Sequence, residues 1–371
     1  RTLEELRIDM KLFCCHVNSM ASLLNVLSRQ KKLKSLHLSA KLIFEQNSDG
    51  PRLLESIVRL PQIKDIRLDF FQHETTSIRF AMMNIYITIL SNLTKIQKLL
   101  LRTSNYWDPC HLSKCQKVKL LELQIPVIPN MEVSTKLENA ILALHNLETL
   151  IFEARIDYHN STSNLNALFG ELCQKKLKKF EGKFIMQGYY DLEPCKFSKL
   201  YNFMKSSVSD QLSLNFVSME PVTKIDLLNL ANSMLAMKTL PSFSLTLDYI
   251  LVPPEELVNF ISSLSRCQSL LNLSLDFKSI SGESTILSIA KILPSLPSLQ
   301  VLHLKLSIPA TKARQKDLQL IENLCNSLAQ LPSLSTLNLT LATNFFWTEK
   351  QSSALASSLS SLKHLRTLHL E

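Results

Sequence analysis

LPSLSTLNLTL, the stretch from Leu331 to Leu341, is the clearest copy of a phrase that recurs throughout this chain. From Leu337 onward, leucines alternate with polar residues, as expected of a β-strand that is buried on one face. Related phrases occur as LPSLQVLHLKL at 296–306, KKLKSLHL at 31–38 and KHLRTLHL at 363–370. An internal repeat of this kind predicts one repetitive architecture rather than several globular domains.

Each phrase is numbered here from its first core residue. The starts fall at 3, 33, 63, 96, 118, 147, 177, about 209, about 242, 270, 299, 334 and 365. The mean spacing of about 30 residues leaves room for a strand and a helix in every unit. The segments between the phrases favour helices, because their apolar residues recur at intervals of three and four. One example is the stripe Leu257, Phe260 and Leu264, which follows a helix-starting Pro254.

On these phrases and intervening segments, the chain resembles the leucine-rich repeat proteins of the ribonuclease-inhibitor-like, strand-plus-helix kind. The resemblance covers essentially all 371 residues. It implies an α/β fold: a right-handed leucine-rich repeat solenoid, or horseshoe, with a parallel sheet on the concave face and helices on the convex face. The curvature is expected because strands stack at about 4.8 Å, whereas helices need roughly 8–10 Å between axes. The asparagine that usually follows the family's core phrase is absent.

We expect residues 1–371 to form a single solenoid of about thirteen repeats, irregular near 102–117 and 182–211. The segment SNYWDPCHLSKCQ predicts a loop or a short turn in place of a helix. The phrase LKKFEGKF replaces a leucine by Phe180 and admits Gly182, and DQLSLNF is the weakest predicted strand. The chain opens inside one phrase and closes inside another, so we expect it to be an excerpt of a longer protein.

Composition excludes several function classes. The chain has 5 glycines and no G-x-G-x-x-G or P-loop string, which argues against phosphate-cradling loops. No apolar run approaches the roughly 20 residues needed to cross a bilayer. The eight cysteines are scattered without a disulfide-like pattern, which predicts a cytoplasmic location, with a nuclear one left open. We expect no cofactor and no small-molecule substrate.

Metal and catalytic sites are not expected either. Cys110, His111 and Cys115 lie close together, but their spacing lacks the two-pair pattern of a structural zinc site. Cys14, Cys15 and His16 have the same weakness. The sequence contains no H-E-x-x-H, no G-x-S-x-G and no kinase signature. These observations predict a protein that is not an enzyme.

Residues between the strand leucines should line the concave face, where a partner could bind. The candidates in the first repeats are mostly charged: Arg7, Lys34, His37, Lys64, Arg67, Asp69, Lys98 and Arg102. Over all expected concave positions of the first seven repeats, however, ten basic residues stand against nine acidic ones, and this near balance argues against a nucleic-acid groove. The candidates in the last repeats are polar: Asn272, Ser274, His303, Asn338 and Thr340. Two such patches suit a protein or peptide, although simple solvated strand residues would show the same pattern.

Two further surfaces are candidates for partner binding. Lysines gather where helices lead into strands and should form a basic rim: Lys31, Lys32, Lys95, Lys114, Lys117, Lys175 and Lys176. Lysines there would also offset helix dipoles, which is a structural explanation that requires no partner. The aromatic residues Phe345, Phe346 and Trp347 could form a loop anchor if they are exposed.

Three functions follow as hypotheses. The first is a non-enzymatic protein-binding scaffold, or a subunit of a larger intracellular assembly, that uses the concave face or the basic rim. The second is an RNA-associated ribonucleoprotein component that uses the rim. The third is the substrate-recognition arm of a ubiquitin ligase or a sensor protein. The resemblance favours the first, because leucine-rich repeat proteins typically bind proteins.

Overall fold

The structure is a computed structural model. It describes residues 3–43, 55–57, 59–60, 63–72, 95–102, 109–125, 131–157, 161–187, 197–218, 225–237, 239–250, 252–277, 283–308, 314–343 and 349–371. The chain forms two compact units. The N-terminal unit is Arg1–Arg155 with His159–Leu177, and the C-terminal unit is Ile156–Tyr158 with Lys178–Glu371.

Parallel strands form the sheet of the described chain, and its strand order follows the chain from β1 to β13. In the N-terminal unit the strands are β1 (Glu5–His16), β2 (Ser35–Ile43), β3 (Asp65–Gln72), β4 (Lys98–Arg102), β5 (Leu120–Ile125) and most of β6 (Thr149–Asp157). The strands that follow are β7 (Leu177–Gln187), β8 (Val208–Ser218), β9 (Ser242–Asp248), β10 (Asn272–Phe277), β11 (Val301–Ile308), β12 (Thr336–Thr343) and β13 (Thr367–Leu370).

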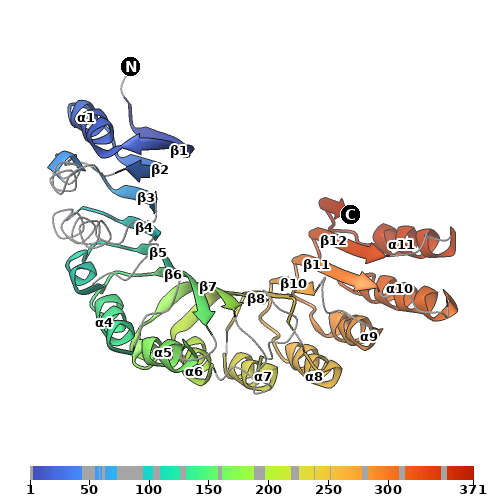
Figure 1. Cartoon of the computed structure of the whole chain (residues 1–371). Helices are drawn as coiled ribbons and strands as arrows, with labels where there is room; N and C mark the ends of the chain where they lie inside the picture. The colour runs from blue at the N-terminus through green and yellow to red at the C-terminus, as the bar shows by residue number, and fades with distance from the viewer. Residues whose placement is uncertain are drawn as a thin grey trace. The chain divides into compact units, whose positions relative to one another are not determined.

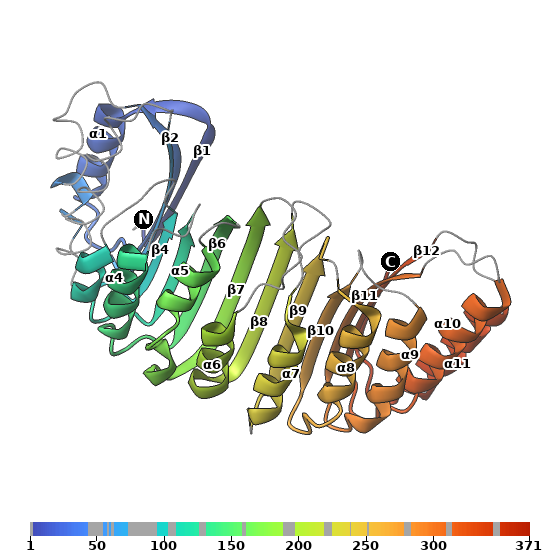
Figure 2. The same ribbon diagram turned by 60° about the horizontal axis from the view of Figure 1, so that its bottom comes forward.

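Helices connect the strands and cover one face of the sheet in each unit (Figure 1). The N-terminal unit contains α1 (Val17–Leu27), the 3₁₀ helix η1 (Pro109–Lys114), α4 (Met131–Leu142), α5 (Ser161–Leu168) and the 3₁₀ helix η2 (Leu172–Gln174). The C-terminal unit contains α6 (Ser198–Ser207), α7 (Leu227–Ala236), α8 (Pro254–Leu264), α9 (Glu283–Ile292), η3 (Leu293–Ser295), α10 (Arg314–Leu328) and α11 (Glu349–Ser361). The other side of the sheet in each unit is called the open face below (Figure 2).

Strand register follows the sequence phrase. Ser35 pairs with Asp65, Asn272 with Val301, and Thr336 with Thr367, so equivalent phrase positions lie side by side. One predicted start was wrong. Asn272 pairs with Ser242, which places the start of that phrase at Leu240 rather than near 242. Phe243 takes the place of a strand leucine there, and this substitution hid the phrase in the sequence.

A repeated main-chain contact fixes this register where each strand begins. The carbonyl oxygen of Glu4 accepts from the N–H groups of both Lys34, at 2.8 Å, and Ser35, at 3.1 Å. The carbonyl of Gln300 accepts in the same way from Ser335 and Thr336. Because one carbonyl holds two successive amides of the next repeat, a slip of a single residue would break both bonds and turn the core leucines outward.

The core lies between sheet and helices. Leu275, Leu304 and Leu337 are fully buried, as are Leu264 and Leu328 on the helices that face them. Burying one such side chain stabilises the fold by about 1.5–3 kcal/mol. The predicted helix over the Leu257–Leu264 stripe is confirmed as α8, with Pro254 in its first turn and Glu255 and Glu256 beside it.

Residues 177–187 and 197–218 form β7, α6 and β8, whereas residues 188–196 of the segment predicted to be irregular lie outside the described residues, so that irregularity stays a prediction. DQLSLNF lies within the eleven-residue strand β8, which pairs with β9. Aromatic rings replace leucines in the core here: Phe184 stacks on Phe216 with ring centroids 5.4 Å apart, and Phe180 meets Phe203 edge-on at 5.0 Å. The predicted weakness reflected this change of residue type, because the phrase was defined by leucine.

Gly182 lies between the two strand phenylalanines. A Cβ atom at this glycine would come within 2.7 Å of the Phe184 ring and 3.1 Å of the Phe180 ring. The rings therefore fill the space that a side chain would need. In the other predicted irregular segment, near 102–117, the described part 109–114 forms the single 3₁₀ helix η1.

Candidate functional site

The open face of the N-terminal unit carries charged residues in rows across neighbouring strands. Register places Arg7 beside His37, His37 beside Arg67, and Arg67 beside Leu100. Adjacent strands are about 4.8 Å apart, so these side chains are near neighbours. The two arginines and the histidine therefore form a short basic row that ends at a leucine.

Ion pairs link positions on adjacent strands of this face. The Nζ of Lys98 lies 3.9 Å from an Asp65 carboxylate oxygen, and the Nζ of Lys34 lies 3.0 Å from Glu4. Burial raises the pKa of Asp65, and the charge of Lys98 opposes that rise. These exposed pairs are worth little individually, because solvent and salt screen them. Their effect is to set the local balance of charge.

A shallow hollow of about 200 Å³ lies on this face, between β1 and β5. Leu100 and Leu120 contribute apolar surface to it, and Arg67, Lys98 and Glu122 are among its charged lining. Leu100 is 5% exposed although it stands in a row that is otherwise polar on β1–β3. The Nε of Arg67 is buried and has no hydrogen-bond partner among the described residues. The hollow thus combines an apolar floor with an incompletely satisfied cation.

Some predicted candidates cannot be placed at the level of the side chain. The backbones of Asp69 and Arg102 lie in β3 and β4 and pair with each other, but their side chains are outside what the structure describes. Phe345, Phe346 and Trp347 lie wholly outside the described residues, so the loop anchor stays a prediction. Lys34 and Lys64 are exposed at the start of β2 and β3.

The open face of the C-terminal unit carries hydrogen-bonding side chains in register. One row runs across the strands as Ser213, Ser244, Ser274, His303, Asn338 and His369. A second row runs as Asn215, Thr246, Asp276, Lys305 and Thr340. Asn272, another predicted candidate, is half-buried beside Ser242 and Val301. The structure therefore brings the predicted polar candidates of β10–β12 onto one surface.

Asn338 lies between the two histidines of the first row. Its Oδ1 is buried and has no hydrogen-bond partner among the described residues. Burial lowers the pKa of the neighbouring His303, and the positive charge of Lys305 lowers it further, so the neutral form of His303 is favoured. An unsatisfied buried amide oxygen costs free energy, and a donor from a partner would remove that cost.

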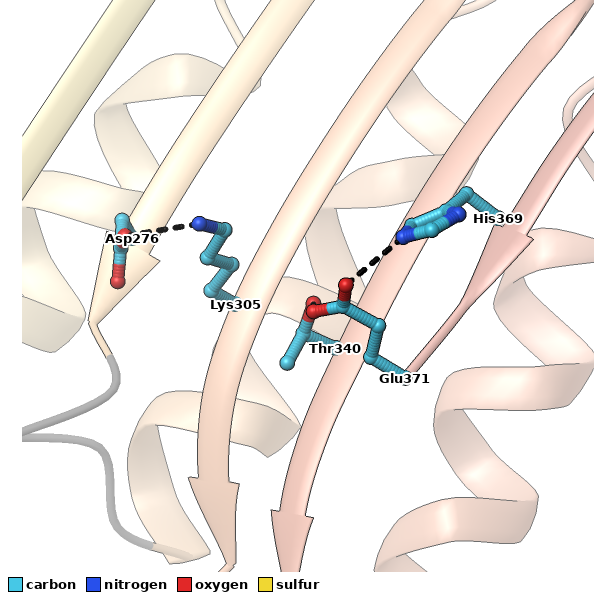
Figure 3. Close-up of polar contacts among 5 residues, drawn as sticks. All are labelled: Asp276, Lys305, Thr340, His369 and Glu371. Atoms are coloured by element: carbon cyan, nitrogen blue, oxygen red, sulfur yellow. Dashed lines mark hydrogen bonds and ion pairs between the residues drawn. The ribbon is translucent and has the colours of Figure 1, made fainter.

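Three charged residues near this row were missed by sequence reasoning. The Nζ of Lys305 lies 3.8 Å from Asp276 (Figure 3). Glu371 accepts a hydrogen bond from the Thr340 hydroxyl at 3.2 Å and lies 2.9 Å from the His369 Nε2. The His369 contact is the main cause that lowers the pKa of Glu371. Their position in the repeat could have identified them, because each stands six residues after a phrase start: Asp276, Lys305 and Glu371.

The predicted basic rim is partly corrected. Lys31, Lys32, Lys95, Lys114, Lys117 and Lys176 are exposed. Lys175 is not part of an exposed rim, because it is 8% exposed. Its Nζ donates to the carbonyl of Leu142 at 3.3 Å and to that of Leu144. It therefore satisfies main-chain acceptors at the end of α4, which is the structural role that lysines at helix ends can have.

The two cysteines of the Cys110, His111 and Cys115 cluster differ in exposure. Cys110 is exposed, whereas Cys115 is 1% exposed, and burial raises the pKa of its thiol to about 12. No group of three potential metal ligands occurs among the described residues. Within the same residues, no helix has the length and apolar character that a membrane crossing requires.

The registered phrases, the parallel sheet in chain order and the helices on one face together define the class. The chain has the leucine-rich repeat fold, with a strand and in most repeats an α-helix. No family model and no curated protein matches the sequence. Among solved structures, the chain is similar to an internalin (inlF) of Listeria monocytogenes str. 4b F2365. The two share 14% sequence identity, with 98% of this chain and 86% of that chain covered and a TM-score of 0.43.

Proposed function

We propose that this chain is a non-enzymatic scaffold that binds a protein partner through the open face of its C-terminal unit. The observation that carries this function is the row of hydrogen-bonding side chains that includes His303, Asn338 and His369. Six strands take part, so the row is about 24 Å long. That length suits a segment of protein, whereas small molecules bind in enclosed pockets.

The chemistry of this surface favours a partner that offers hydrogen-bond donors. The Oδ1 of Asn338 is already withdrawn from solvent and has no described partner. When the Asn338 side chain turns outward on binding, a main-chain N–H from a bound segment would satisfy this oxygen. In its neutral form, which burial favours, His303 presents one ring donor and one ring acceptor. Polar contacts of this kind select a partner by geometry more than by charge.

The hollow on the N-terminal unit supports the same function as a second, separate patch. Its apolar floor at Leu100 and Leu120 and its charged margin at Arg67 and Lys98 resemble the centre and rim of a protein interface. The two patches differ in chemistry, since one is charged and the other is nearly neutral.

Capture experiments with matched variants test the proposal. The chain is immobilised and exposed to an extract of its source cells at about 0.15 M salt. The open-face variant carries His303→Ala, Asn338→Ala and His369→Ala. The control carries Asn326→Ala, Ser353→Ala and His364→Ala, which are exposed residues on α10, on α11 and before β13. We expect the control to retain the wild-type partner and the open-face variant to lose it. Equal retention by both would contradict the proposal.

A second candidate function is RNA binding. It is favoured by one observation, the exposure of six of the seven rim lysines. If RNA is the physiological ligand, binding of generic single-stranded RNA should weaken steeply between low and moderate salt, because phosphate contacts release counterions. Salt-insensitive capture of one protein would instead support the scaffold.

Two further expectations stay predictions. A role as the recognition arm of a ubiquitin ligase or sensor depends on domains other than these repeats. A cytoplasmic location, with a nuclear one left open, rests on the scattered cysteines alone. Reading the flanking sequence in the source genome tests the first, and imaging of a tagged full-length protein tests the second.

A further inference from the structure

Six lysines line the edge of the N-terminal unit at which the chain passes into β2–β5. Lys32, Lys95 and Lys117 stand directly before the first core residue of a phrase, and Lys34, Lys64 and Lys119 stand directly after one. All six side chains are exposed. They are called the lysine edge below. It differs from the predicted rim, because it includes Lys34 and Lys64, which the sequence assigned to the concave face, together with Lys119, and it excludes the buried Lys175.

The geometry of the lysine edge follows from strand alternation. Leu33, Ile63, Ile96 and Val118 are buried, so the residues on either side of them point away from the core. Main-chain hydrogen bonds hold the repeats in step, for example from Lys64 N to Lys34 O at 2.8 Å and from Lys119 N to Gln97 O at 2.8 Å. The backbones of Lys34 and Lys64 are thus about 5 Å apart on adjacent strands, whereas Gln97 separates Lys64 from Lys119.

Only part of this positive charge is neutralised within the described chain. Two of the lysines that directly follow a phrase start have acidic partners. The Nζ of Lys34 lies 3.0 Å from Glu4, and that of Lys119 lies 3.6 Å from Glu148. Lys32, Lys64 and Lys117 form no ion pair with any residue that the structure describes. Like charges at this spacing repel one another, and a bound polyanion would relieve that repulsion.

The C-terminal unit shows that strand starts do not require lysines. Its residues before the phrase starts are Val208, Thr239, Ser269, Ser298, Ser333 and His364, and those after are Asp210, Pro241, Leu271, Gln300, Ser335 and Arg366. Helices lead into strands in this unit too, so compensation of helix dipoles would favour lysines in both units. Lysines also flank the start of β7, as Lys176 and Lys178, but they are absent from the positions directly flanking the starts of β8–β13. Dipole compensation alone therefore does not explain where the lysines gather.

The residue types indicate an acidic polypeptide rather than RNA. Proteins that hold single-stranded nucleic acid stack its bases on aromatic side chains. No aromatic residue directly flanks the phrase starts at 33, 63, 96 and 118. Lysine provides a point charge without the planar fork that arginine uses for phosphate. Glu4 and Glu148 stand at the two ends of the edge and would repel a longer polyanion.

We propose that the lysine edge docks a short acidic segment of the protein partner, a run of about four or five aspartates or glutamates in extended conformation. The length follows from three strand steps of about 4.8 Å and an extended rise of about 3.3 Å per residue. This inference rests on the proposed protein-binding function, and it adds a second contact that is read by charge.

The test measures fluorescence anisotropy of a labelled peptide with five consecutive glutamates in a Gly-Ser frame, against the same peptide with glutamines. The edge variant carries Lys64→Ala, Lys95→Ala and Lys117→Ala. The control carries Lys199→Ala, Lys291→Ala and Lys363→Ala, three exposed lysines of the C-terminal unit. We expect the edge variant to bind the acidic peptide about tenfold more weakly, since three screened ion pairs are lost, and the control to bind within about twofold of wild type.

Three results would overturn the proposal. Equal weakening in both variants would show attraction by net charge alone, and no preference for glutamate over glutamine would show that charge is not read. Tighter binding of an oligouridine of matched length, lost in the edge variant, would make the edge a nucleic-acid surface. The open-face variant separates the two proposals, because it should bind the acidic peptide like wild type even if it loses the captured partner.

Discussion

The ammonium group of Lys175 donates to the main-chain carbonyl of Leu142, 33 residues earlier in the chain, at 3.3 Å. A second bond from the same Nζ reaches the carbonyl of Leu144. Between the same two repeats, Glu138 in α4 accepts from the N–H of Leu172 at 3.1 Å and from that of Glu171. A buried lysine and a buried glutamate thus join two adjacent repeats by satisfying each other's helix ends.

Replacement of this lysine should destabilise the N-terminal unit. Lys175→Met leaves the carbonyls of Leu142 and Leu144 without their donor, and we expect a loss of about 1–3 kcal/mol in the free energy of unfolding at pH 7. Urea unfolding followed by circular dichroism measures it. The matched control is Lys176→Ala, an exposed neighbour that should change stability by less than about 0.5 kcal/mol. An unchanged urea midpoint for Lys175→Met would refute the prediction.

The same lysine predicts a dependence on pH. Burial lowers the pKa of Lys175 from its ordinary value of 10.5, so the unfolded chain binds this proton more tightly than the folded chain. Stability therefore rises with pH between the lowered pKa and 10.5. We expect the difference in unfolding free energy between wild type and Lys175→Met to grow as pH is raised from 7 through this window. A difference that stays constant or shrinks would argue against it.

The two glycines described in the structure should differ in how well they tolerate alanine. At Gly182 a new Cβ would meet the Phe184 ring at 2.7 Å, and overpacking of this kind costs about 1–3 kcal/mol. At Gly170 the nearest atoms would be 3.4 Å and 3.5 Å away, which is ordinary contact. We expect Gly182→Ala to lower the melting temperature and Gly170→Ala to leave it nearly unchanged. The reverse order would mean that the aromatic core can yield.

Tyr249 has a backbone φ of 54°, the only positive value for a residue other than glycine in the described chain. Its side chain is 60% exposed. This conformation costs a residue with a Cβ about 1–2 kcal/mol, whereas glycine adopts it readily. Tyr249→Gly should therefore be more stable than Tyr249→Ala by about 1 kcal/mol. At Ser284, exposed in α9, the order should reverse, because glycine is the poorer helix former.

Thiol chemistry should separate the cysteines by burial. Cys110 is exposed, whereas burial raises the pKa of Cys115 to about 12 and that of Cys325 to about 11. In the folded protein at pH 8, iodoacetamide should label Cys110 within minutes and leave Cys115 and Cys325 unlabelled, as read by peptide mass spectrometry. Labelling of all three in urea is the control. Rapid labelling of Cys115 without denaturant would mean that η1 opens readily.

The sequence by itself determined the repeat, the class of fold and most of the register. Leucines at a period of two within each phrase can be buried only on one side of a strand, and the phrase LPSLSTLNLTL therefore specified β12 and its neighbours. The same rule placed Ser274, His303 and Asn338 on the open face. Where Phe243 or Phe180 replaced leucine, the letters changed but the buried volume was kept. The leucine pattern was therefore lost in the sequence, although the strands themselves are regular.

Tertiary structure alone decided which polar residues are exposed and which have partners. Lys175 and Lys176 are adjacent and chemically identical, yet one is buried against the end of α4 and the other faces solvent. The unsatisfied oxygen of Asn338 depends likewise on what its neighbours on β11 and β13 leave uncovered. Such contacts join residues about thirty positions apart. Their strength depends on side-chain direction and local solvent, neither of which is encoded by spacing along the chain.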